Sequence, residues 1–240
     1  MAQHISRKEL KKDEVRETLA HGAEAVFSHQ RATGIILGVA ALVLVAVFGW
    51  RFYSERQTLK ASAAFDAAMK TYDARIRAAG EASEPNEVTY VEEKNKYQDA
   101  AKKFSEVAAK YPRTRPGQLA RYYTALSQIR LNQFDEAQKN LTALESGSSD
   151  EFASLARFQL AGIYERTGKA EEAAKLYRQL ADKPTALVPK PTALLALADA
   201  LRKSNPQEAT KVYEQIKKDF PDTPSAEEAQ KQLDTLGPKT

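Results

Sequence analysis

The chain has 240 residues and a formal net charge of +4, and 42% of its residues are hydrophobic against 28% charged. This composition excludes both a disordered chain and a protein embedded entirely in a membrane. The absence of cysteine excludes disulfides and thiol chemistry, and the interspersed charges, which form no basic stripe, argue against nucleic-acid binding.

The first segment, residues 1–31, is charged and is predicted to be helical. Ser6 and Glu9 have the spacing of a capping box, in which each side chain bonds the backbone of the other residue. The apolar residues here form no continuous face, so we expect a surface or partner-binding helix. His4, His21 and His29 are the only histidines of the chain, and with no cysteine beside them we expect no metal site.

Residues 32–50 contain neither a charge nor a proline. A helix of this length spans about 28 Å, close to the roughly 30 Å hydrocarbon core of a bilayer. Its Leu, Ile, Val and Phe residues favour insertion by roughly 3 to 6 kcal/mol. The sequence therefore predicts a transmembrane helix.

Two other interpretations of this segment are weaker. A buried core helix would lack apolar partners in so polar a chain. A cleaved signal peptide usually has a shorter apolar region that lies nearer the N-terminus and ends at a small-residue site. We expect the segment to stay as an anchor.

The flanks of the predicted anchor carry two further signals. Trp50, Phe52 and Tyr53 occupy positions typical of an interfacial aromatic belt. Gly34 and Gly38 form a GxxxG pattern, which favours packing against another membrane helix. Basic residues near the anchor are divided almost evenly between its two ends, so the charge bias does not decide which side of the membrane the C-terminal domain occupies.

Residues 51–89 are predicted to form a post-anchor helix and a loop. The helix is expected to continue from the anchor, since residues 51–79 contain no proline or glycine. Residues 80–88 are rich in turn-forming and charged residues and read as the loop.

A repeated ladder of apolar residues marks residues 90–240. Each ladder has an alanine, a large residue four positions later and an apolar residue three positions after that. The four ladders are Ala100-Phe104-Val107, Ala137-Leu141-Leu144, Ala173-Tyr177-Leu180 and Ala209-Tyr213-Ile216, and Pro112, Pro184 and Pro221 follow three of them. Such spacing predicts helical hairpins in which the small residue lets two helices approach and proline stops the second helix.

The pattern resembles the tetratricopeptide repeat (TPR), and one repeat matches its motif at Leu160, Ala161, Tyr164, Gly168, Ala173, Tyr177, Leu180 and Pro184. Asn132 and Gly168 hold matching turn positions, where a left-handed residue would end each first helix. Residues 181–191 form a longer connection than TPR arrays normally use, and a last helix beginning near Pro224 would cap the array. We therefore predict an all-α fold, with an N-terminal transmembrane helix followed by a TPR-like α-solenoid of about three to four hairpins and a C-terminal capping helix.

The whole arrangement of charged segment, anchor and TPR-like domain resembles the bacterial YfgM-like family of ancillary SecYEG translocon subunits. That resemblance implies a single-pass protein of the bacterial inner membrane with a cytoplasmic N-terminus and a periplasmic repeat domain. It also implies contacts with a SecYEG-type translocon and with a membrane-anchored periplasmic chaperone.

No motif for catalysis or for a cofactor is present, and the carboxylates occur where solvated helix faces are expected. We expect a protein that is not an enzyme and that binds no cofactor. Groove-lining positions on the first helices of the hairpins are predicted at Tyr122, Leu126, Ile129, Phe158 and Glu165.

These observations favour a membrane-tethered adaptor that recruits partners or engages emerging polypeptides at a secretion channel. The alternative is a structural scaffold of an envelope or cell-division complex, in which the GxxxG helix and the N-terminal segment drive self-association. An envelope hydrolase is a third hypothesis, which would need a catalytic pair of carboxylates.

Overall fold

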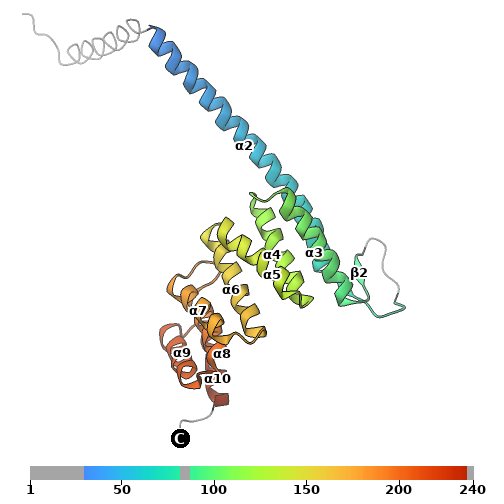
Figure 1. The fold of residues 1–240 in the computed structure, drawn as a ribbon, viewed down its shortest axis with the longest axis vertical. Coiled ribbons are helices and arrows are strands. Elements are labelled where there is room, and N and C mark those ends of the chain that lie inside the picture. The colour runs from blue at the N-terminus through green and yellow to red at the C-terminus, as the bar shows by residue number, and fades with distance from the viewer. Residues whose placement is uncertain (1–29, 82–86, 237–240) are drawn as a thin grey trace, which may run out of the picture. The chain divides into compact units, whose positions relative to one another are not determined.

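The computed structural model describes residues 30–81 and 87–236, and these residues are helical apart from turns, connections and one short strand pairing (Figure 1). The predicted all-α fold, an apolar N-terminal helix followed by a TPR-like solenoid, is confirmed. The capping box at Ser6 and Glu9 lies outside the described residues.

Helix α2 (Gln30–Tyr72) covers the predicted anchor and continues well beyond it. Its large apolar side chains between Ile35 and Tyr53 are 54% to 70% exposed. By length and composition it is the one described helix able to cross a membrane. An apolar surface this large and this exposed is typical of a segment that a membrane or a protein partner covers.

The chain divides into two compact units at the junction of Arg56 and Gln57, and this junction lies inside α2. In the second unit, Ala61 and Ala68 of α2 are 0% and 1% exposed and share a core with Ala100 and Phe104 of α3. The last turns of α2 are therefore the first helix of the first hairpin. The sequence pattern had set the repeat domain at residues 90–240, because the core-facing residues of α2 are mostly alanines, which carry a weak hydrophobic signal.

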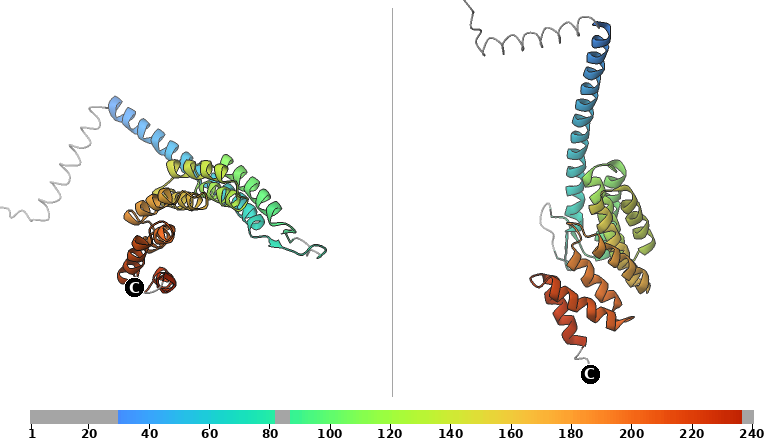
Figure 2. Two further views of the ribbon diagram at one scale, coloured as in Figure 1. Left: turned by 60° about the horizontal axis from the view of Figure 1, so that its bottom comes forward. Right: turned by 90° about the vertical axis from the view of Figure 1, so that its left-hand side faces the viewer.

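Consecutive helices of the second unit pack against each other in a row that ends with α10 (Figures 1 and 2). These helices are α3 (Glu93–Lys110), α4 (Arg115–Arg130), α5 (Phe134–Gly147), α6 (Asp150–Arg166), α7 (Ala170–Asp182), α8 (Lys190–Leu201), α9 (Pro206–Asp219) and α10 (Pro224–Leu236). The hairpins are the end of α2 with α3, α4 with α5, α6 with α7, and α8 with α9. Helix α10 follows as the cap, and it begins at the predicted proline.

The four apolar ladders lie on the second helices of the hairpins and form the core. The four ladder alanines are all 0% exposed, and no other ladder residue exceeds 6%. Because alanine occupies the closest approach, the large residue one turn later reaches into the space between neighbouring helices. This arrangement confirms the predicted packing role of the ladders.

The turns inside the hairpins have the left-handed backbone that the sequence predicts. Asn132 has a φ of 59° and Gly168 a φ of 79°, and each directly follows a first helix. At the start of α4, the Thr114 hydroxyl accepts a hydrogen bond from the Gly117 N–H at 3.1 Å. A side chain on Gly117 would place its Cβ 1.9 Å from the Tyr111 carbonyl oxygen, so this cap requires glycine.

The long connection between α7 and α8 is folded onto the core. Val188 is 2% exposed, and its N–H donates to the Thr185 hydroxyl at 3.1 Å. The Thr185 hydroxyl also hydrogen-bonds the Ser154 hydroxyl of α6 at 2.7 Å. The extra residues therefore supply a buried apolar plug between two hairpins.

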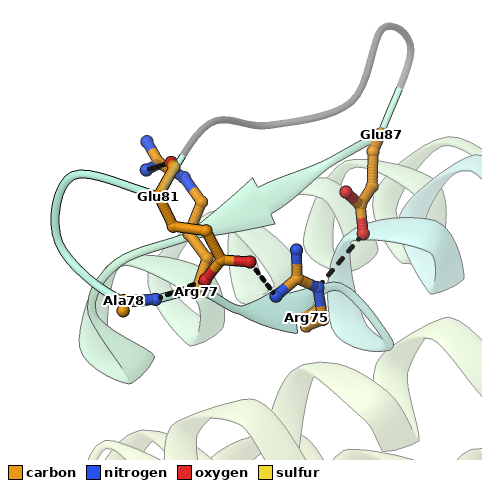
Figure 3. Close-up of polar contacts among 5 residues, drawn as sticks. All are labelled: Arg75, Arg77, Ala78, Glu81 and Glu87. Atoms are coloured by element: carbon orange, nitrogen blue, oxygen red, sulfur yellow. Dashed lines mark hydrogen bonds and ion pairs between the residues drawn. The ribbon is translucent and has the colours of Figure 1, made fainter.

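A two-residue parallel pairing joins β1 (Arg75–Ile76) to β2 (Thr89–Tyr90), a feature the sequence did not predict. Beside it, the Arg75 guanidinium bonds Glu81 at 2.8 Å and Glu87 at 3.3 Å (Figure 3). These groups are exposed, so the ion pairs link residues beside the two strands and add little stability.

The first prediction concerns Phe104, which is 0% exposed and touches the rings of Phe65, Tyr72 and Tyr123. Phe104→Ala is expected to lower the free energy of unfolding by about 3 to 5 kcal/mol, because it leaves a cavity among three helices. Urea denaturation of the detergent-solubilised chain, followed by circular dichroism, measures this loss. Glu106→Ala, on the exposed side of the same helix, is the control and is expected to change stability by less than about 0.5 kcal/mol.

Candidate protein-binding surface

One buried alanine recurs on the first helix of every hairpin and fixes a common strip beside it. These alanines are Ala68, Ala125, Ala161 and Ala198, each 0% or 1% exposed. The residues three before, one after and four after each alanine share one side of the helix, since they are spaced i, i+4, i+7. We call this strip the first-helix surface; its members are Phe65, Met69 and Tyr72 on α2, Tyr122, Leu126 and Ile129 on α4, Phe158, Gly162 and Glu165 on α6, and Leu195, Asp199 and Arg202 on α8.

The part of the first-helix surface on α2 and α4 is aromatic and half-buried. The Tyr123 ring lies 5.2 Å from the Tyr72 ring, 5.7 Å from that of Phe65 and 5.7 Å from that of Tyr122, all in edge-on contacts. Edge-on pairs add about 0.5 to 1.5 kcal/mol each beyond the area they bury. The aromatic residues therefore hold the two hairpins together while leaving part of each ring open to a partner.

Contacts between helices α4, α6 and α7 continue the strip. The Gln159 side-chain amide of α6 donates to the Tyr122 hydroxyl of α4 at 3.0 Å. The Phe158 ring of α6 lies 5.3 Å from the Tyr177 ring of α7, in a T-shaped contact. Tyr122 and Phe158 are thus held in fixed positions, which lowers the entropy lost when a partner binds.

Two exposed carboxylates replace the apolar residues on α6 and α8. The Tyr177 hydroxyl donates to Glu165 Oε2 at 3.0 Å, and the Tyr213 hydroxyl donates to Asp199 Oδ1 at 2.5 Å. Each tyrosine comes from the second helix of the same hairpin and is equivalent in the two repeats, whereas the carboxylates differ in position, Glu165 four residues after Ala161 and Asp199 one residue after Ala198.

The electrostatics of these pairs follow from burial and from the nearness of two like charges. Although the residue as a whole is exposed, its neighbours remove part of the water around the Glu165 carboxylate, and this desolvation raises its pKa above the usual range. The charge of Asp199 raises that pKa further, while the hydrogen bond from Tyr177 and the charge of Arg166 oppose the rise. Burial also raises the pKa values of Tyr177 and Tyr213, so both hydroxyls keep their protons and remain donors at neutral pH.

The predicted groove residues occupy different environments. Tyr122, Leu126 and Phe158 are half-buried on the first-helix surface, and Glu165 is exposed on it. Ile129 is only 7% exposed and packs in the core between α4, α5 and α6. The binding role of all five stays a prediction.

Sequence reasoning did not single out Tyr72, Gly162 or Asp199, which the structure adds to the same strip. The sequence does contain the spacing that marks them. Tyr72 is four residues after Ala68, Gly162 is one after Ala161, and Asp199 is one after Ala198. The pattern on α2 was missed because residues 51–89 were predicted to be a post-anchor helix and loop outside the repeat domain.

The predicted membrane-packing glycines, Gly34 and Gly38, lie on the exposed apolar part of α2. No atom lies within 4 Å of a Cβ added at either position. Another helix could therefore approach closely here, and this role also stays a prediction.

Among the residues in the described ranges, no group of three or more His, Asp or Glu side chains is arranged to hold a metal ion. His4, His21 and His29 lie outside those ranges.

Comparison with protein families identifies the fold. Residues 29–189 match the family described as the tetratricopeptide repeat-like domain, and residues 192–223 match the tetratricopeptide repeat. The chain belongs to the tetratricopeptide repeat-like domain family. Its first match spans α2 and the first three hairpins, and its second covers the fourth hairpin.

No curated protein and no solved structure matches this TPR-like protein. Domains of this class typically bind other proteins, and neither matching family is a catalytic one. The matches therefore support protein partners in general, whereas the likeness to translocon subunits stays a prediction.

The second prediction tests the pair formed by Tyr177 and Glu165. Tyr177→Phe keeps the ring contacts and removes the donor, so we expect a loss of about 1 kcal/mol in the free energy of unfolding at pH 7. The Glu165 pKa is then expected to rise further, since the lost bond favoured the charged form.

The sign of the pH dependence follows. Because the folded pKa of Glu165 is raised, its protonation favours the folded state, and the stability that this proton contributes is lost as pH rises through that pKa. The defect of Tyr177→Phe should accordingly shrink as pH falls and Glu165 becomes neutral. Urea denaturation at several pH values measures it; Tyr164→Phe in the same hairpin is the control, and an equal pH dependence in both variants would contradict the assignment.

Proposed function

We propose that this protein is a membrane-anchored TPR adaptor of the bacterial inner membrane that brings partners to the Sec translocon. The observation that supports this most strongly is the continuity of α2, whose first part is exposed and apolar and whose last part carries core alanines of the first hairpin. The predicted anchor and the first helix of the repeat domain are parts of the same helix.

The chemistry at the end of the apolar part supports a membrane boundary there. Trp50, Phe52 and Tyr53 are 58% to 68% exposed, as expected of rings that sit among lipid headgroups. The Arg56 guanidinium lies 4.3 Å from the centre of the Phe52 ring, one helical turn away. Such a cation over an aromatic ring keeps its charge at the polar side of the interface.

The repeat domain supplies the binding function. Its first-helix surface offers aromatic rings held in fixed positions beside the exposed carboxylates Glu165 and Asp199. A tethered domain meets partners in the same membrane at a high effective concentration, so modest contacts are sufficient. We assign the repeat domain to the periplasm, with a translocon subunit, a membrane-anchored chaperone and emerging polypeptides as the partners, and we propose no enzymatic activity and no cofactor.

A second candidate function is a scaffold that assembles with copies of itself in an envelope or cell-division complex. The open positions at Gly34 and Gly38 favour it, because a second α2 helix could pack there.

The third prediction tests the anchor. Leu42→Arg combined with Val45→Arg places two charges in the middle of the apolar segment, each costing about 2.5 to 3.5 kcal/mol in insertion. The protein is expected to move from the membrane pellet to the soluble fraction after carbonate extraction at high pH. Leu42→Ala with Val45→Ala is the matched control and should remain in the pellet. Wild-type protein that is itself extracted by carbonate would contradict the anchor.

The fourth prediction tests the partners. A photo-crosslinking amino acid at Leu126, on the first-helix surface, is expected to capture translocon subunits and a membrane-anchored chaperone in intact cells. The same probe at Gln138, on the second helix of that hairpin, is the control and should capture neither. Capture of the protein itself or of division proteins alone would favour the scaffold.

A reporter active only outside the cytoplasm, fused after Thr240, tests the topology in the same strain. We expect it to be active, because the proposed repeat domain is periplasmic. A silent reporter, together with activity of a reporter that works only in the cytoplasm, would contradict the periplasmic assignment and with it the translocon role.

A further inference from the structure

Gly162 stands out on the first-helix surface because nothing inside the chain requires a glycine there. It lies in the middle of α6, where glycine weakens a helix relative to alanine. Its φ is not in the left-handed region, and an added Cβ would meet only the Tyr177 hydroxyl, at an ordinary contact distance of 3.8 Å. The missing side chain therefore leaves an open position on the helix, here called the notch, that no contact inside the chain requires.

The notch has an apolar wall on one side. Phe158 lies one turn before Gly162 on α6, and its half-buried ring is held against Tyr177. Tyr122, at the equivalent position on α4, is held by Gln159, and Leu126 is half-buried at the position equivalent to Gly162 itself. The main chain of a peptide that passes over the notch would meet Phe158 of α6 first and then Tyr122 and Leu126 of α4.

The other side of the notch carries two carboxylates, with the charges of Arg166 and Arg202 nearby. Glu165 lies one turn after Gly162, and Asp199 occupies the equivalent strip on α8, near enough for its charge to affect Glu165. In the described part of the chain both carboxylates bond a tyrosine hydroxyl, and neither forms an ion pair with a lysine or arginine. Arg202, which lies close by on the strip, instead donates to Gln232 of α10 at 2.6 Å.

We propose that the notch at Gly162 receives an extended peptide segment of a protein partner, with apolar side chains toward α4 and a lysine or arginine side chain toward Glu165 and Asp199. The cation would relieve the repulsion between two like charges, and the exposed lone pairs of both carboxylates would accept its N–H groups. This inference rests on the proposed adaptor function and adds the chemistry and the direction of the bound segment.

The spacing of the helices sets the spacing of the peptide. Packed helices lie about 8 to 10 Å apart, and an extended chain advances about 3.3 Å per residue. The path from α4 to α8 crosses two such distances, α4 to α6 and α6 to α8, and therefore corresponds to about five or six residues between the apolar and the basic side chains.

The test uses the full chain in phosphatidylcholine nanodiscs and two fluorescein-labelled peptides. The first has two leucines followed, about five residues later, by two lysines, in a background of alanine and serine; the second has glutamates in place of the lysines. Fluorescence anisotropy, corrected for binding to empty nanodiscs, is expected to show at least about tenfold tighter binding of the lysine peptide. Equal affinity of the two peptides would overturn the proposal.

Charge variants identify the residues involved. Glu165→Gln and Asp199→Asn keep an oxygen that accepts from the tyrosine, so each should preserve folding and weaken the lysine peptide several-fold. Glu172→Gln makes the same charge change on the second helix α7 and is expected to leave the affinity unchanged. A loss of the same size in Glu172→Gln would mean that net charge alone drives binding, which would overturn the proposed site.

Variants of the glycine separate binding from stability. Gly162→Ala is expected to raise Tm, because alanine favours a helix, and yet to weaken the lysine peptide; Gly162→Leu should weaken it more. Gly147→Ala, at the end of α5, is the control and should leave the affinity unchanged. Wild-type affinity in Gly162→Leu would overturn the proposal.

Photo-crosslinking in cells distinguishes a failure of this inference from a failure of the adaptor function. If Gly162→Leu still yields the partners captured from Leu126, the adaptor stands and the peptide notch is refuted. Loss of those partners in Gly162→Leu, with the anchor still in the membrane, supports both.

Discussion

Close approach of paired helices at buried alanines is the constraint on which this structure depends. Each hairpin has one fully buried alanine on its second helix, and the residue one turn later, Phe104, Leu141, Tyr177 or Tyr213, fills the space that the approach creates. A larger residue at the alanine would separate the helices and leave its neighbour without contacts. In every hairpin a small residue thus packs beside a large one, and each repeat is stabilised mainly by contacts with the next repeat.

The same constraint explains why the two parts of α2 differ in the size and exposure of their apolar side chains. Its first part exposes branched apolar side chains on all sides, which suits a lipid environment. Its last part presents Ala61 and Ala68 to α3, which suits close helix packing. One helix therefore contains both the exposed apolar segment and the first helix of the first hairpin.

The first-helix surface changes its chemistry from one hairpin to the next. On α2 and α4 its aromatic rings contribute to the core through Phe104 and Tyr123, so stability and recognition draw on the same side chains. On α6 and α8 the core is completed by Tyr177 and Tyr213 of the second helices, and these buried tyrosines donate through their hydroxyls to the exposed residues Glu165 and Asp199. On these later hairpins Phe158 and Leu195 still pack against the core, whereas the remaining positions of the strip carry Gly162 and the charged residues Glu165, Asp199 and Arg202.

The sequence by itself determined the fold class, the apolar helix, the four ladders and the left-handed turns at Asn132 and Gly168, because each depends on residues close together along the chain. Helical periodicity, proline and glycine act on residues that are close in sequence, so their effects can be predicted from the sequence alone. Three features were decided only by the tertiary structure: the entry of α2 into the first hairpin, the burial of Ile129, and the pairing of Glu165 with Tyr177 and of Asp199 with Tyr213. Each of these depends on which faces meet across a turn, and the sequence pattern specifies that a helix has an apolar face without specifying the neighbour that covers it.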